Sequence, residues 1–591
     1  MTTQLITSYF KLHNVNQFKE SISETANSVY YIFAGKHTEY PSGDSVIPTI
    51  TNSVNETLYN SYEEMVFGKR VTPTDVLPVV PRYNWTTNTF YSAYRSNENL
   101  TDKQYYVCVD GGAAFHVFKC LDNNGNTASV IQPDVTQTTP NDTYYSTSDG
   151  YVWKFMYSVD STTFNKFATS TYMPVIANTE VSGNAVSGSI DVITLSYAGS
   201  NYNSYLSNTF ISTDLRVGGD PLKYNIANTA SASNNFYLNS FLYIVDGTGS
   251  GQGRKIVDYT VVGSSKTVTL SEAFDTSPDT TSQYQITPYV LITGDGSGAE
   301  ARALINNSSS NAVYQVEIIS RGSGYTYASA TVLGNTGGVS NAAVLEVVLG
   351  PKGGHGSNPE YELGCGALCM SVSYANSESG TIPAVNDYRA IGILKDPLFA
   401  NVVLTVGSPT GSFNVGQVVT QANTGAQGVV TEWDSINTLS LSNVSGIFLT
   451  GNSSVNLLTE AYSGSTATLS SYQINGQSKN FNTFDQRYRY TFTPIDGTFT
   501  ADEVIYQTDV QLANAVFHSN TSANLYLTHV NGTLNTGNTI IGQQSGATAN
   551  LLFSYPPDLV VGSGEVLYVE NESPITRSSS QSETIKIILQ F

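Results

Sequence analysis

A histidine set among glycines is the residue whose type and setting first suggest chemistry. His355 lies in the run Gly353-Gly354-His355-Gly356, and histidine is the usual general base near neutral pH. No Gly-x-Ser-x-Gly motif stands out in the chain to supply it with a nucleophile. Glycines on both sides are more typical of tight backbone packing or of positive φ angles. We therefore expect His355 to have a structural role.

Four cysteines could in principle bind a metal or form disulfides: Cys108, Cys120, Cys365 and Cys369. Cys365 and Cys369 are separated by three residues, whereas most zinc knuckles use two, and no second Cys/His pair lies nearby. Cys108 and Cys120 could face each other across a hairpin. We expect buried, reduced thiols, and leave open whether His355, Cys365 or Cys369 binds metal.

A glycine-rich run has some features of a phosphate-binding loop. Gly247, Gly249, Gly251 and Gly253 alternate before Arg254-Lys255. A phosphate loop places Ser or Thr after its lysine and continues into a helix. Ile256 follows the lysine instead, and the downstream residues have the pattern of a strand. This segment is expected to be a hairpin turn.

Three aspartates in Gly/Ser-rich segments are too scattered for a calcium site, which needs clustered oxygen ligands. We expect Asp246, Asp275 and Asp295 to be solvated turn residues. Together these motifs nominate no catalytic, cofactor-binding or metal-binding residue, and the chain is predicted not to be an enzyme.

The net charge and composition of the chain disfavour two classes of function and indicate the fold class. The formal net charge of −21 disfavours nucleic-acid binding, which depends on neutralising phosphates. No stretch approaches the ~18 consecutive apolar residues of a membrane span, so membrane insertion is not expected. Charged residues make up 12%, while Ser, Thr, Asn, Gly and Tyr are abundant, which favours turn-rich β structure.

The elements that must position these residues are mostly strands. Helices are predicted at 14–27 and 53–67, the second with Ser53 as N-cap and Glu56 completing a capping box. A strand is predicted at 29–33, and strands at 105–109 and 115–121 flank the turn Gly111-Gly112 as a hairpin. Another strand is expected at 151–159.

Two kinds of repeat follow. Residues 190–200 and 316–330 each show an apolar strand, a glycine turn and a tyrosine. A stronger repeat lies in 401–554. The block SFNVGQVVTQ from Ser412 matches TFTADEVIYQ from Thr498, and TLSLSNVSG from Thr438 matches NLYLTHVNG from Asn524, both at an offset of 86 (498 − 412 and 524 − 438). Two small all-β modules in tandem are predicted here.

Several segments, in order, resemble one family: the baseplate wedge protein encoded by gene eight of T-even-type contractile phages, in a longer myovirus form. They are VYYIFAGKHTEYPSGD from Val29, KRVTPTDVLPVVPRYNW from Lys69, VFKCLDNNGNT from Val117, SDGYVWKFMYSV from Ser148, GPKGGHGSNPEYELGC from Gly350, NDYRAIGILKDP from Asn386 and GEVLYVENESPITRSSSQSETIKIILQF from Gly564. The regions 181–349 and 401–554 depart from the shorter family pattern.

The resemblance implies a mainly β, multidomain chain, α+β at its N-terminus, with a β-sandwich or barrel-like core interrupted by insertions. The expected division is a wedge core at 1–180, 350–400 and 555–591, an inserted β region at 181–349, and inserted tandem modules at 401–554. The implied function is a structural subunit of the tail baseplate wedge that takes part in the rearrangement before sheath contraction. The implied partners are other wedge proteins and a second copy of the chain, in a virion assembled in the bacterial cytoplasm. The inserted modules could also contact the host surface.

Two other functions stay open. One is a receptor- or glycan-binding tail adhesin, which the aromatic, weakly charged β modules would suit. The other is a tail-associated polysaccharide hydrolase, which would need a paired acid or His-centred site that the sequence does not display.

Overall fold

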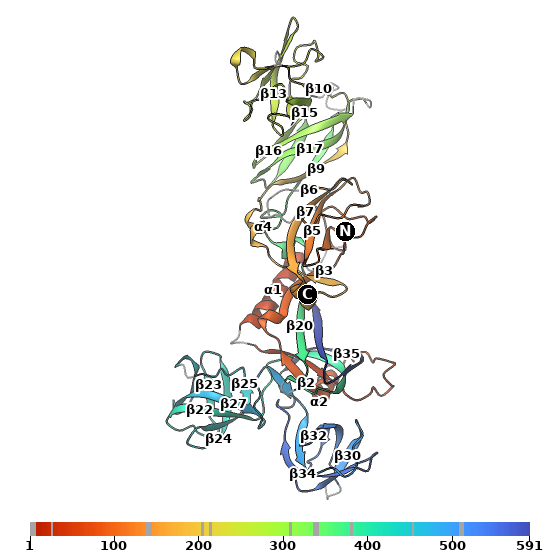
Figure 1. Cartoon of the computed structure of the whole chain (residues 1–591). Coiled ribbons are helices and arrows are strands. Elements are labelled where there is room, and N and C mark those ends of the chain that lie inside the picture. The colour runs from red at the N-terminus through yellow and green to blue at the C-terminus, as the bar shows by residue number, and fades with distance from the viewer. Residues whose placement is uncertain are drawn as a thin grey trace. The chain divides into compact units, whose positions relative to one another are not determined.

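The computed structural model describes residues 7–24, 28–136, 145–202, 206–211, 215–306, 310–334, 342–378, 382–451, 454–507 and 513–591. Within them the chain is mainly β, with several sheets and small closed barrels (Figure 1). It divides into two compact units, Met1–Val79 with Gly366–Phe591, and Val80–Cys365. The predicted mainly β, multidomain fold is confirmed. The five-part division is finer than these units and stays a prediction.

The first helix of the first unit, α1, spans Ser8–Ser23. It starts earlier than the predicted 14–27, because Thr7 caps it by accepting the Phe10 N–H at 3.2 Å. Its buried residues Leu12, Val15 and Ile22 lie on one face by their helical spacing. The last residues of the predicted range, 25–27, lie outside the described residues.

The second helix, α2, spans Val54–Glu64 and differs from its prediction in two ways. Ser53 occupies the N-cap position, but its side chain makes no capping hydrogen bond, so the capping box is wrong. The Glu56 carboxylate instead accepts from Thr51 Oγ1 at 3.4 Å. The helix also ends before Met65, because Met65–Arg70 forms strand β2 and buries its first residues in a sheet.

Two antiparallel sheets form the core of the first unit. One has the order β28-β2-β1-β21-β35, and the other contains β36, β20 and β3. The strands are β1 (Tyr30–Gly35), β2 (Met65–Arg70), β3 (Val76–Pro81), β20 (Ala367–Ala375), β21 (Asn386–Lys395), β28 (Thr483–Asp485), β35 (Glu565–Arg577) and β36 (Ser582–Gln590). Every residue of β1 is buried, and the strand predicted at 29–33 is confirmed with a shifted start.

The tandem modules are two closed six-stranded barrels, drawn in teal and blue in Figure 1. The first has β22 (Val402–Thr410), β23 (Val418–Gln421), β24 (Ala426–Trp433), β25 (Thr438–Ser445), β26 (Leu457–Glu460) and β27 (Thr466–Ile474). The second has β29 (Tyr488–Phe492), β30 (Val504–Gln507), β31 (Asn514–Asn520), β32 (Asn524–Asn531), β33 (Thr539–Gly542) and β34 (Thr548–Tyr555).

The two barrels have the same strand order, β22-β25-β24-β23-β26-β27 and β29-β32-β31-β30-β33-β34. Their first strands start 86 residues apart (488 − 402), as do their fourth strands (524 − 438). Their last strands start 82 apart (548 − 466), so the second barrel lacks four residues before that point. The predicted tandem modules are confirmed. Between them the chain returns to the core as β28, which pairs with β2.

The second unit begins with a sheet of order β4-β5-β7-β6: β4 (Tyr106–Asp110), β5 (Ala114–Asn123), β6 (Tyr145–Ser146) and β7 (Tyr151–Asp160). The hairpin around Gly111-Gly112 and the strand predicted at 151–159 are confirmed. Its short helices are α3 (Ser161–Phe167), α4 (Thr179–Gly183) and α5 (Pro359–Glu362).

Further along, β9 (Ile190–Tyr197) pairs with β19 (Val344–Leu349), so the chain leaves and re-enters this region at adjacent strands. Between them lies a sheet of order β11-β14-β13-β12-β15-β16-β17, with β10 and β18 also paired to β15. Its strands are β10 (Leu206–Thr209), β11 (Lys223–Asn225), β12 (Ser240–Asp246), β13 (Gly253–Val262), β14 (Ser265–Leu270), β15 (Gln283–Gly294), β16 (Ser297–Asn306), β17 (Ala312–Ser323) and β18 (Ala328–Val332).

Candidate functional site

His355 lies in a closed network of charged side chains in the second unit. Its side chain is 1% exposed, with Nε2 at 3.1 Å from the Asp191 carboxylate and Nδ1 at 3.8 Å from that of Glu362. Lys119, equally buried, forms an ion pair with Glu362 and places its ammonium 4.3 Å from the centre of the Tyr94 ring. A network sealed from solvent cannot receive a substrate, which supports a structural role.

The glycines around His355 explain how this network closes. Gly354 and Gly356 have φ angles of +92° and +88°. A Cβ at Gly354 would come within 2.5 Å of the Val186 backbone, and one at Gly356 within 2.3 Å of the Val181 side chain. Both the positive φ angles and the tight packing predicted for this loop are confirmed. The Gly356 N–H also donates to Glu362 at 2.7 Å.

Burial and neighbouring charges set the protonation of this network. Burial lowers the pKa of His355, and the Lys119 charge lowers it further. Burial alone would raise the pKa of Asp191, but His355 and Arg321 hold it below its usual value. Burial also lowers the pKa of Lys119, against the attraction of Glu362.

The other predicted features have structural explanations. All four cysteines are buried as free thiols, and burial raises the pKa of Cys108 and of Cys369 to about 12. Cys108 and Cys120 do not face each other, because the strand register sets Cys108 opposite Val117. In the residues the structure describes, no group of three or more His, Cys, Asp or Glu side chains is placed to hold a metal ion.

The glycine run forms the turn between β12 and β13, as predicted, and Lys255 lies over the ring of Tyr289 at 5.3 Å. Asp246 accepts the N–H of Gly247 at 2.9 Å, within its own turn. Asp275 is an 85% exposed partner of Arg254. Asp295 accepts from Thr326, whose hydrogen bonds lower the pKa of that carboxyl to about 2. These turn roles are confirmed.

A groove of about 420 Å³ lies in the first unit between α2, the segment 40–51 and β35. Much of its lining is apolar, including Phe33, Val46 and Val569. Two of its charged side chains, Lys36 and Glu64, form an ion pair at 2.8 Å. The groove therefore offers shape and apolar surface rather than acid–base chemistry.

A group of polar side chains in the first unit joins the second barrel to the core. We call it the polar junction, and its members are His37, Asn386, Asp485, Arg487, Asp502, His518, Thr528 and His529. His37 follows β1, Asn386 begins β21 and Asp485 ends β28, whereas Asp502, His518, Thr528 and His529 belong to the second barrel. The junction thus connects core strands with a module that is distant in sequence.

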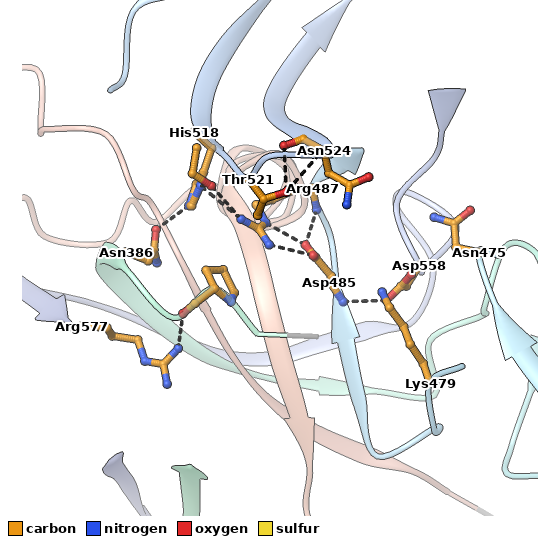
Figure 2. Close-up of polar contacts among 12 residues, drawn as sticks. Asn386, Asn475, Lys479, Asp485, Arg487, His518, Thr521, Asn524, Asp558 and Arg577 are labelled. Atoms are coloured by element: carbon orange, nitrogen blue, oxygen red, sulfur yellow. Dashed lines mark hydrogen bonds and ion pairs between the residues drawn. The ribbon is translucent and has the colours of Figure 1, made fainter. Parts of the chain in front are cut away.

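Within the junction, Arg487 links Asp485 to His518 (Figure 2). Its guanidinium donates twice to the Asp485 carboxylate, at 2.9 and 2.8 Å, and once to His518 Nδ1 at 3.2 Å. It also lies 4.0 Å from the centre of the Tyr526 ring. Since Asp485 and Arg487 are both buried, this bidentate pair fixes the angle at which the chain leaves the core sheet and enters the barrel.

A second buried ion pair, between Lys479 and Asp558, contacts the backbone of Asp485. Asp558, which is 1% exposed, pairs with Lys479 at 2.7 Å and accepts the Asp485 N–H at 2.8 Å (Figure 2). Burial raises the pKa of Asp558 above its usual value, although Lys479 opposes that shift. Lys479 precedes the second barrel in the chain and Asp558 follows it, so the pair closes the base of the module.

Sequence reasoning missed the polar junction. His37 contacts Asp502 and Thr528 across 465 and 491 residues, and nothing in their spacing indicates the pairing. The available signal was composition: the chain has six histidines, and His37, His518 and His529 are three of them.

Within the described residues, no helix has both the length and the apolar character needed to cross a membrane. No protein-family model and no curated protein matches the chain.

Proposed function

We propose that this chain is a structural subunit of the baseplate wedge of a contractile phage tail, and that it acts through protein–protein contacts rather than catalysis. In this role it would join neighbouring wedge proteins, pair with a second copy of itself, and take part in the rearrangement that precedes sheath contraction. Its location would be the virion, after assembly in the bacterial cytoplasm.

The observation that carries the proposal is that segments resembling the wedge family, far apart in sequence, are neighbours in the structure. In the first unit, β1, β21 and β35 come from three of these segments. β1 pairs with β21 over Tyr30–Gly35, and β21 pairs with β35 along its length. A common core with later insertions between its strands would produce this arrangement.

The second unit gives a parallel observation. The segments from Val117 and Ser148 supply β5 and β7, which pair side by side. The buried ion pair between Lys119 and Glu362 then links the segment from Val117 to the segment from Gly350. Three resembling segments therefore meet in this unit as well.

The remaining regions have the form of additions. Each tandem module is a closed barrel, which has no free strand edge and adds no strand of its own to the core sheets. The region 181–349 contains β9 near its start and β19 at its end, and these two strands pair. These additions would enlarge the subunit around a shared core.

The test is the solution mass of the purified chain by light scattering, alone and mixed with the phage's other baseplate proteins. The wedge role predicts a dimer that joins larger mixed species. A stable trimer that ignores those proteins and binds host polysaccharide would replace it with the adhesin function. Turnover of cell-wall or capsule polymer by the pure protein would replace it with the hydrolase.

A further inference from the structure

Three histidines meet where the second barrel contacts the core. The ring centres of His37 and His518 are 5.0 Å apart, and those of His37 and His529 are 6.0 Å apart. His37 comes from the core, whereas His518 and His529 come from β31 and β32 of the barrel. Histidine is the side chain whose ordinary pKa lies closest to neutrality.

Hydrogen bonds require His518 to be neutral in the attached state. Its Nδ1 faces Arg487 Nη1 at 3.2 Å, and a guanidinium can only donate, so Nδ1 must accept. The proton therefore lies on Nε2, which donates to Asn386 Oδ1 at 2.6 Å. Adding a second proton would break the bond from Arg487 and place two positive charges about 3 Å apart.

The surrounding charges only partly offset such protonation. The Asp502 carboxylate is already engaged by His37 Nδ1 at 2.6 Å. The Asp485 carboxylate is already engaged by both arms of Arg487. The charged groups that act on the two barrel histidines are Arg487 on His518, and Lys36 and Asp502 on His529. From the core side, Arg389 donates to the His37 carbonyl. The other charged groups beside them are already paired: Glu64 with Lys36, Asp44 and Asp387 with Arg389, and Asp485 with Arg487.

We propose that mild acid releases the second barrel from the core by protonating His518 and His529, while the first barrel stays attached. The inference rests on the geometry of the junction and does not depend on the wedge role.

The sign and the pH window follow from the attached state. Burial lowers the pKa of His518 well below its usual value and that of His529 to about 4. Because both rings are held neutral, their contribution to attachment is complete above the ordinary histidine pKa, near 6.5, and falls as the pH drops toward 4. With these values, protonation of His529 alone weakens attachment about 30-fold at pH 5.

The experiment measures two distances in the full chain with pairs of spin labels. The four native cysteines are buried, so labels react at introduced ones. Leu567→Cys marks core strand β35, Ser522→Cys marks the turn between β31 and β32, and Ile436→Cys marks the equivalent turn of the first barrel (522 − 436 = 86). All three positions are exposed.

Between pH 7.5 and 4.5 the 567–522 distance should lengthen and broaden reversibly, with a midpoint between pH 6.5 and 4. The 567–436 distance should stay unchanged. Two unchanged distances, or two that change together, would overturn the proposal.

Variants assign the effect to the histidines. The double variant His518→Gln/His529→Gln should keep the 567–522 distance unchanged down to pH 4.5. The control His13→Gln changes an exposed histidine of α1 and should release the second barrel as the parent does. If the double variant is already released at pH 7.5, His529→Gln alone is used, because it leaves the His518 hydrogen bonds in place. In this single variant the equilibrium constant for release at pH 5 should be about 30-fold smaller than in the parent. Release identical to the parent would overturn the assignment.

Discussion

The two barrels share strand order but are attached to the same core by opposite means. The interior of the first barrel is continuous with the core sheet: Tyr31, Phe399 and Phe481 belong to one buried cluster with the barrel's own residues. The second barrel keeps a separate hydrophobic cluster and contacts the core through the polar junction. A repeated module can thus keep its interior while its outer contacts diverge completely.

The shared interior includes a buried glutamine at the same place in each barrel. Gln421 donates to the carbonyl of Leu449 at 2.8 Å and accepts the Leu449 N–H at 2.7 Å. Gln507 makes the same two bonds with Asn535, both at 2.8 Å. Both glutamines are fully buried, and both pairs lie 86 residues apart (507 − 421 and 535 − 449).

A buried carboxylate shows how the copies diverged inside. In the first barrel Glu460, at the end of β26, accepts from Ser463. In the second barrel Gly542 occupies the place of Glu460, and Glu503, whose counterpart is Gln417, accepts from Ser545 at 2.7 Å. A Cβ at Gly542 would meet the Glu503 carboxylate at 2.7 Å. The same polar position is therefore filled from different strands.

The largest expected effect comes from breaking the apolar attachment. Phe399→Ala removes a buried ring whose centre lies 4.9 Å from that of the Phe481 ring. The backbone of Phe399 pairs with that of Val444 in β25. We expect the free energy of unfolding to fall by about 4 kcal/mol, equally at pH 7.5 and pH 6, in chemical denaturation. Phe553→Ala, at a 65% exposed ring of the second barrel, is the matched control and should change it by less than about 0.5 kcal/mol.

Breaking the polar attachment comes next. Arg487→Met leaves the buried Asp485 carboxylate without its bidentate partner, and we expect a loss of about 3 kcal/mol in the stability of attachment. Faster hydrogen exchange in β29–β34, with no change in β22–β27, would identify the affected module. Equal acceleration in both barrels would contradict the separate attachment.

The buried glutamines test the shared interior. Gln421→Ala and Gln507→Ala each remove a fully buried amide together with its two hydrogen bonds to a backbone N–H and C=O, so each should cost about 2 kcal/mol. Site-resolved hydrogen exchange should show the loss in the barrel that carries the change. Costs that differ strongly between the two variants would show that the barrels are not equivalent inside.

The smallest effect is a rescue. Glu460→Gly should destabilise the first barrel, and adding Gln417→Glu should recover about 1 kcal/mol, because the pair reproduces the second barrel's arrangement. In the second barrel, hydrogen bonds from Ser545 hold the pKa of Glu503, the counterpart of the introduced glutamate, below its usual value, although burial opposes this. The rescued stability should therefore be present at pH 7 and lost as the pH falls through the carboxyl pKa. No recovery at pH 7 would refute the exchange.

The sequence predicted what depends on local pattern. The offset of 86 located both barrels, since the starts of β22, β23 and β25 recur at that spacing in β29, β30 and β32. The glycines around His355 indicated their backbone angles, because few other residues adopt them.

What depends on distant partners could not be predicted. The Ser53–Glu56 pattern was overridden by Thr51, whose Oγ1 contacts Glu56. The return of the chain as β28 rests on pairing with β2, about 400 residues away. The polar junction likewise brings together residues as far apart in sequence as His37 and His529.

Native-state hydrogen exchange at pH 7.5, in increasing denaturant, tests the difference in attachment most directly. The shared hydrophobic cluster predicts that β22–β27 open together with β1 and β21 at one free energy, whereas β29–β34 open as a separate unit at a lower one. If the second barrel opened only with the core, or the first barrel opened alone, the contrast between apolar and polar attachment would be wrong.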